Sequence, residues 1–259
     1  MIKRHENYKE LVLRLAKTDF KLRYYGSFLG YLWAVLKPLL MFIVLNFVFS
    51  SIFNFRNSGT PNYPLELLTG IIMFQFFSEG TMNGMMSLLN KSQLVTKIYV
   101  PRWTIVIGST LNSFFVYLVN LIVLGIFFVI YDITPTLEGV LMFVLYSILL
   151  YILVVAFSFL TSTLFVRFRD LGTIWEVLLS VLMYASPIIY PLSMLPDKYH
   201  SFVLMNPLAF IIHYSKQGAI NQIFTSFEKF AILTVSVLLL TIFAYIIFKK
   251  YERRVAEFV

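Results

Sequence analysis

The stretch KSQLVTKIYVPRW (residues 91–103) separates two long apolar runs and determines how the chain on either side is interpreted. It carries three cations, Lys91, Lys97 and Arg102, and no acid. Pro101 closes it, because proline has no N–H to donate and disfavours the helical region for the residue before it. We interpret this segment, called the elbow below, as a cytoplasmic connection between two membrane spans and a place where a partner can push. The alternative is a tight basic turn with only a topological role.

Composition places the chain in a membrane. It has 259 residues, 59% of them hydrophobic and only 13% charged, and its mean hydropathy is +0.81. Soluble domains carry roughly 25% charged residues. The apolar runs are continuous rather than alternating, which favours membrane helices over a β-barrel. The net charge of +8 lies beside these runs, so it indicates membrane topology and anionic lipid rather than nucleic acid.

The apolar runs predict an all-α integral membrane domain over residues 31–248. Six spans are expected, at residues 31–53, 64–89, 104–131, 138–166, 171–190 and 230–248. The second span is the least apolar, since it carries Glu66, Gln75, Glu79 and Asn83, and we expect its polar side to face protein or water. In the first span, Lys37 can extend back to the membrane interface.

The N-terminal segment (residues 1–30) contains a predicted amphipathic helix at residues 6–22. Its apolar and basic residues fall on different faces at spacings of three and four. The apolar face comprises Tyr8, Leu11, Val12, Leu15 and Leu22, and the basic face comprises Arg14, Lys17 and Lys21. Such a helix lies in the membrane interface. It either contacts a substrate or serves only as a basic topology anchor.

Residues 186–227, between the fifth and sixth spans, hold four prolines and apolar pieces too short to cross a bilayer. We expect re-entrant or interfacial half-helices here. A structured external loop is the alternative.

The distribution of cations predicts the orientation. Sixteen Lys and Arg residues fall in the N-terminal segment, the elbow, the turn at residues 167–170 and the tail (residues 249–259), against four in the remaining loops. By the positive-inside rule, both termini are cytoplasmic. Six spans are consistent with that arrangement.

Catalytic motifs are lacking. The chain has no phosphate-cradling glycine loop ending in Lys-Ser or Lys-Thr, and its three histidines lack neighbours at metal-ligand spacing. We therefore expect no enzyme activity, no metal and no cofactor in this chain.

Besides Glu138, which is the first residue of the fourth predicted span, three acids fall within the predicted spans. Glu79 and Glu176 either pair with cations of the elbow or amphipathic helix, or are interfacial carboxylates in contact with water. Glu66 is expected to be solvated. Glycine pairs spaced by four residues predict close helix contact at Gly80 and Gly84, and a bend at residues 26–30.

Three segments carry a family resemblance. They are DFKLRYYGSFLGYLWAVLKPLL (residues 19–40), LVTKIYVPR (residues 94–102) and FRDLGTIWEVLLSVLMYASPIIYPLSMLP (residues 168–196), the last followed by Asn206-Pro207. In this order, on six spans, the chain resembles the permease subunit of ATP-binding-cassette exporters for lipid-linked polysaccharides. Val100 departs from the family pattern, in which an aromatic residue is common.

The resemblance implies a homodimer of six-span subunits around a conduit, with two copies of a separate cytoplasmic ATPase that holds ATP and Mg. The elbow would be a coupling helix (residues 91–102), with residues 95–101 helical and Ile98 and Tyr99 as apolar contacts. The implied ATPase-coupling residues are Val95, Thr96, Lys97, Ile98, Tyr99, Val100, Pro101 and Arg102.

The amphipathic helix would be a gate helix beside the substrate's diphosphate. The residues implied for that contact are Arg14, Lys17, Lys21, Arg23, Tyr24 and Tyr25. Those implied for the conduit or gate are Glu79, Glu176, Pro187 and Tyr190.

The function implied is export of a lipid-linked polysaccharide of the undecaprenyl diphosphate type, such as O-antigen or teichoic acid, across the bacterial cytoplasmic membrane. One alternative is a permease of the same architecture for drugs or small lipids. Another is an ion-coupled carrier or membrane enzyme, although a carrier usually shows internal repeats that this chain lacks.

Overall fold

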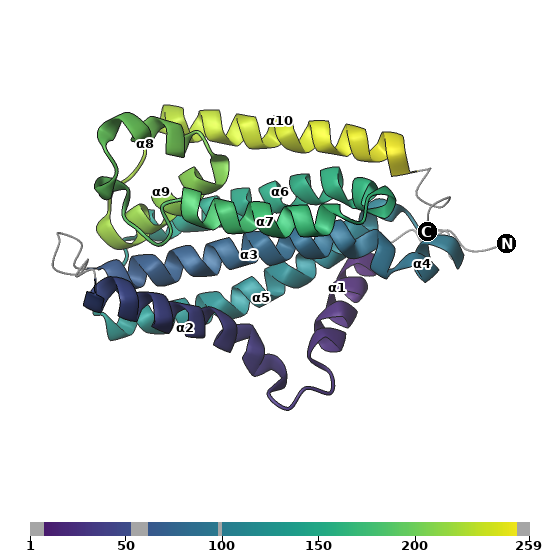
Figure 1. Cartoon of the computed structure of the whole chain (residues 1–259), viewed down its shortest axis with the longest axis horizontal. Helices are drawn as coiled ribbons and strands as arrows, with labels where there is room; N and C mark the ends of the chain where they lie inside the picture. Colours follow the sequence, from purple (N-terminus) through teal and green to yellow (C-terminus); the bar gives the residue numbers. More distant parts are fainter. Residues whose placement is uncertain (1–7, 53–61, 98–99, 253–259) are drawn as a thin grey trace.

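A computed structural model describes residues 8–52, 62–97 and 100–252, and this part of the chain contains helices but no strand (Figure 1). The elements are α1 (Tyr8–Tyr24), η1 (Gly30–Leu32), α2 (Trp33–Asn46), the π-helical η2 (Phe47–Ile52), α3 (Tyr63–Asn90), α4 (Ser92–Lys97), α5 (Arg102–Ile130), α6 (Leu137–Arg167), α7 (Leu171–Ala185), η3 (Leu192–Met194), α8 (Asp197–Leu204), α9 (Pro207–Asn221) and α10 (Phe227–Tyr251).

Helix α3 is the central element of the fold. It packs against α5, α6, α2, α9 and α7, and most of its residues are buried. Its 28 residues extend for about 42 Å at 1.5 Å per residue. Of the polar residues that make this the least apolar predicted span, Glu66 is buried, and Gln75, Glu79 and Asn83 are partly buried and line cavities beside the helix.

Four segments of the described chain are long and apolar enough to cross a membrane: Gly30–Ser50, α5, α6 and α10. They correspond to the first, third, fourth and sixth predicted spans. Helix α7 is apolar but has only 15 residues, or about 22 Å, against a hydrocarbon core of about 30 Å. The prediction of one helix over residues 171–190 is wrong, because Ser186 precedes Pro187 and adopts extended backbone angles.

The two ends of the bundle differ in what they contain (Figure 1). One end holds α4 and the last turns of α6 and α10. The short helices α8 and α9 lie at the opposite end, and α9 packs against α6 and α3. Residues 186–227 are thus folded into short helices and turns, none long enough to cross a bilayer.

The elbow forms a shorter helix than predicted. Helix α4 covers Ser92–Lys97, whereas Val100 and Pro101 are not helical, so the predicted helix over residues 95–101 is wrong in position. Pro101 has φ −58° and ψ 124° and precedes the first residue of α5, which is Arg102. The proline that ends the elbow thus starts the next span. Ile98 and Tyr99 lie outside the described residues.

Both glycine predictions are confirmed. A Cβ atom on Gly80 would lie 2.6 Å from Val154 Cγ1, and one on Gly84 would overlap Ser158, so α3 and α6 touch backbone to side chain. Gly26 and Gly30 have φ of +75° and +47°, values that glycine adopts without strain. They form the bend between α1 and the first span.

Candidate functional site

A cleft of about 790 Å³ lies between the end of α1, helix α2 and the middle of α3. Its charged and polar lining comprises Arg23, Ser27, Lys37, Gln75, Ser78 and Glu79. A second cavity of about 380 Å³ shares Arg23, Lys37 and Glu79 and adds Asn83, Glu176 and Ser180. We call the two together the α1–α3 cleft.

Glu79 is the centre of the charged part of the cleft. Arg23 Nη2 lies 2.5 Å from its Oε2, and Lys37 Nζ lies 3.0 Å from its Oε1. Gln75 Nε2, one turn earlier on α3, donates a hydrogen bond of 3.0 Å to the same Oε1. The Glu79 side chain is 12% exposed. One carboxylate therefore joins a cation from α1 and a cation from α2 to the central helix.

The rest of the cleft is apolar. Its walls are formed by side chains of α2, α3 and α7, among them Leu40, Met41, Val44, Phe74 and Met183. Charge is thus confined to one part of a largely hydrocarbon-lined space. Such a space suits a ligand with an anionic head and an apolar tail, and neither a free ion nor a plain hydrocarbon uses both parts.

A second ion pair fixes α1 near the elbow. Lys91 Nζ lies 2.5 Å from Asp19 Oδ2 and also donates to Ser109 Oγ at 3.1 Å. The rings of Tyr8 and Trp103 contact edge to face at 5.9 Å. One turn of α1 therefore carries Asp19, which contacts the elbow, and the next carries Arg23, which contacts the cleft.

The predicted apolar face of α1 is confirmed over most of its length. Val12 and Ala16 are buried, and Leu15 packs on Gly108 of α5. Leu22 is an exception to the prediction because it is exposed.

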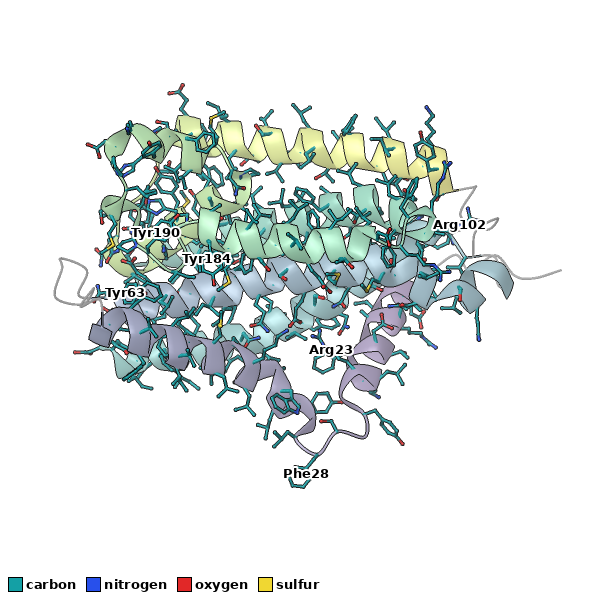
Figure 2. The ribbon with its side chains drawn as sticks, viewed as in Figure 1. Arg23, Phe28, Tyr63, Arg102, Tyr184 and Tyr190 are labelled. Atoms are coloured by element: carbon teal, nitrogen blue, oxygen red, sulfur yellow. The ribbon has the colours of Figure 1, made fainter. Side chains whose placement is uncertain are left out.

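The structure separates the residues predicted to contact a diphosphate. Arg23 extends from α1 toward α3 and lines the cleft (Figure 2). Arg14 instead pairs with Glu10 on its own helix, and Lys17 and Lys21 are exposed. Tyr25 is exposed beyond the end of α1. The side chain of Tyr24 lies outside the described part of the structure.

The residues predicted for a conduit or gate also divide into two places. Glu79 and Glu176 both line the α1–α3 cleft. Pro187 and Tyr190 lie at the end that holds α8 and α9, where Tyr190 donates a hydrogen bond to the Tyr184 carbonyl at 3.1 Å (Figure 2). For Glu79 the structure selects pairing with the amphipathic helix over simple contact with water.

A buried polar cluster lies at that other end. Glu66 is 4% exposed and accepts a hydrogen bond of 2.6 Å from Asn221 Nδ2, so the expectation that it is solvated is wrong. Helix α9 packs over the start of α3 and excludes water from it. On α9, Lys216 is 1% exposed and donates to the Pro187 carbonyl at 2.5 Å. Burial lowers the pKa of Lys216 to about 8.

The sequence does not reveal the contacts of two residues, Lys37 in the cleft and Asp19 beside the elbow. The sequence predicts only that Lys37 extends to the membrane interface, and it assigns no role to Asp19. Each had a local signal: Lys37 interrupts an apolar run, and Asp19 is the single acid in the basic stretch of residues 14–23. Neither signal identifies a partner, because the partners lie 42 and 72 residues away.

The predicted coupling residues lie at the elbow end. Val95, Thr96 and Lys97 form the last turn of α4. Arg102 donates to the backbone carbonyl of Glu252, which ties the start of α5 to the end of α10. No group of three or more His, Asp and Glu residues able to hold a metal occurs in residues 8–52, 62–97 and 100–252.

The helices long enough to cross a membrane, packed around a polar central helix, define an integral membrane protein with several spans. The family description "ABC-2 type transporter" matches residues 10–217, and the chain belongs to that family.

Three relatives show more specifically what the chain is similar to. The chain is 30% identical, over 96% of its length and 94% of the relative's, to the O-antigen export system permease protein RfbA of Klebsiella pneumoniae. It is 31% identical to the protein of that name in Myxococcus xanthus, over 74% of this chain and 72% of the relative. It is 28% identical to the polysialic acid transport protein KpsM of Escherichia coli, over 80% and 79%.

Proposed function

We propose that this chain is the transmembrane subunit of an ATP-driven exporter that moves a lipid-linked polysaccharide across the bacterial cytoplasmic membrane. The relatives named for O-antigen export and polysialic acid transport support the cargo class. The substrate in this proposal carries a diphosphate on a polyprenyl chain, as implied by the resemblance of the sequence motifs.

The α1–α3 cleft is the observation that carries the proposal. It combines Arg23 and Lys37 with hydrocarbon walls from α2, α3 and α7. A lipid diphosphate has the same two parts, since its head forms charge-assisted hydrogen bonds with cations and its chain seeks apolar surface.

The proposed assembly is a homodimer of six-span subunits, with α3 and α7 as the second and fifth spans. Helix α7 is short, so we infer that the extended residues after it complete the crossing. The segment at residues 186–227 forms re-entrant helices at the outer mouth, and both termini lie in the cytoplasm. The excess of Lys and Arg at the elbow end supports this orientation.

Two copies of a separate ATPase bind at the elbow in this proposal and hold the ATP and Mg. Helix α4 and the residues that follow it, up to Pro101, form the contact. We expect Pro101→Ala and Tyr99→Ala to reduce polymer export while ATP hydrolysis by the purified complex stays unchanged. Both activities are measured on the same preparations. Export of polymer by vesicles that lack the ATPase would contradict the coupling.

Deletion of the gene tests the cargo. We expect surface polysaccharide to disappear from an immunoblot of whole cells and lipid-linked polymer to accumulate inside them, with restoration by the wild-type gene. A deletion strain that keeps its surface polysaccharide and changes its drug tolerance would contradict the proposal. That result would favour the alternative permease for drugs or small lipids.

A further inference from the structure

Two cations from different helices converge on one carboxylate in the α1–α3 cleft. Arg23 ends α1, Lys37 lies in α2, and each contacts a different oxygen of Glu79 on α3. The three side chains are exposed by 30%, 65% and 12% respectively. These three side chains together carry one positive charge in excess and open onto hydrocarbon walls, and a second carboxylate, Glu176, lines the adjoining cavity.

An isolated cation beside apolar walls is unfavourable, because it loses water without gaining a partner. Glu79 removes that penalty for the partly buried Arg23, whereas Lys37 is more than half exposed and keeps most of its contact with solvent. Each oxygen of the Glu79 carboxylate accepts a hydrogen bond from a different cation. In charge and geometry, this resembles the way in which two oxygens of a phosphate group would be bound. The position of the Glu79 oxygens therefore marks where a ligand's phosphate oxygens would receive the same two donors.

We propose that Glu79 is a resident counter-anion, and that a polyprenyl diphosphate binds by replacing its carboxylate on Arg23 and Lys37. This inference rests on the proposed function and gives it an atomic site. The lipid's hydrocarbon chain lies along Leu40, Met41 and Val44 of α2. Arg14, Lys17 and Lys21, which the resemblance implied as diphosphate contacts, are outside this site.

The sign of the Glu79 effect distinguishes this role from a merely structural one. A structural ion pair holds the cleft in shape, so its loss weakens binding of every ligand. A resident counter-anion competes with the ligand, so its neutralisation strengthens binding of anionic ligands only. The competing charge lies within hydrogen-bond distance of both donors, where Coulomb interactions are largest.

The experiment titrates farnesyl diphosphate onto the full-length protein, purified together with any subunit that accompanies it. We expect Glu79→Gln to tighten binding about tenfold and Lys37→Gln to weaken it about tenfold. Lys37 is more than half exposed, so its variant is expected to fold even if Glu79→Gln does not.

Glu10→Gln is the matched control. Glu10 pairs with Arg14 of the same helix at 2.5 Å, but both side chains are exposed and lie outside the cleft. We expect this variant to bind farnesyl diphosphate within twofold of the wild type.

Three further ligands identify what the site recognises. Farnesol lacks the charge, inorganic diphosphate lacks the chain, and phosphatidylglycerol is a bulk anionic lipid. We expect each to bind at least tenfold more weakly than farnesyl diphosphate. Equal binding of any one of them overturns the proposal, as does a folded Glu79→Gln protein whose affinity for farnesyl diphosphate is unchanged or reduced.

The result separates this inference from the proposed function. If deletion abolishes surface polysaccharide but Glu79→Gln does not tighten binding, the function stands and the counter-anion role is wrong. Suppose instead that surface polysaccharide survives deletion of the gene, while the variants bind farnesyl diphosphate as expected. The binding site is then correct, and the proposed cargo of the exporter is wrong.

Discussion

Gly84 and Gly80 lie where α3 and α6 are in close contact, and an added Cβ on either residue has no room. A Cβ on Gly84 would overlap Ser158 and lie 3.0 Å from Thr110 Cγ2 of α5. The central helix is therefore held by two neighbours at the same turn. Close packing of this kind contributes more between membrane helices than in water, because lipid provides no hydrophobic drive for helices to associate.

Gly84→Ala is expected to lower the free energy of unfolding in detergent by about 1–3 kcal/mol, because α3 and α6 must separate to admit the methyl group. Thermal unfolding of the purified protein measures this. Gly125→Ala on α5 is the control, since nothing lies within 4 Å of the added Cβ and the change should stay within about 1 kcal/mol. An equal loss at both positions would contradict the packing argument.

At the scale of elements, α1 is held by contacts at two levels. Its buried residues pack on α5, while Asp19 and Arg23, one helical turn apart, form ion pairs with Lys91 and Glu79. An amphipathic helix that only anchored topology would need neither pair. The double attachment supports a role for α1 in linking the elbow to the cleft.

Loss of the Asp19–Lys91 pair should loosen α1 without unfolding the bundle. We expect Asp19→Asn to increase amide hydrogen exchange over residues 8–24. Asp19→Asn and Lys91→Gln together should cost less than the sum of the two, with a coupling of about 0.5–3 kcal/mol. The measurements are exchange by mass spectrometry and a thermal double-mutant cycle.

The exposed pair Glu10–Arg14 on the same helix serves for comparison, because exposed pairs one turn apart contribute only about 0.3–0.5 kcal/mol. If the effects of Asp19→Asn and Lys91→Gln on stability are additive, the two side chains do not interact, which would contradict the role of this ion pair in holding α1.

For the whole molecule, the two ends of the bundle face different compartments in our proposal. The chain has no cysteine, so a single introduced thiol reports one position without interference. Gln93 on α4 and Tyr199 on α8 are both exposed and lie at opposite ends.

In spheroplasts, a membrane-impermeant maleimide should label Tyr199→Cys and should label Gln93→Cys only after lysis. The reason is the positive-inside rule, which places the cation-rich elbow end in the cytoplasm. Labelling of both variants before lysis would contradict the orientation, and wild-type protein, which lacks a thiol, provides the blank.

The amino-acid sequence by itself determined that the chain is a helical membrane protein, where most helices begin and end, and to which kind of family it is similar. Apolar runs, prolines and glycines influence the backbone locally, over one or two helical turns, so their effects can be predicted directly from the sequence. The bends at Gly26 and Gly30 and the start of α5 after Pro101 follow from such local rules.

Only the tertiary structure decided which charges meet. Glu66 is buried because α9 packs over it, and its hydrogen-bond donor, Asn221 of α9, lies 155 residues later in the sequence. Glu79 is paired with Arg23 and Lys37, which lie 56 and 42 residues before it. An ion pair or a buried carboxylate depends on the distance between side chains in space, and helix packing sets that distance. The sequence could name Glu79 and Arg23 as candidates, but the packing of α1 and α2 on α3 made them one site and added Lys37.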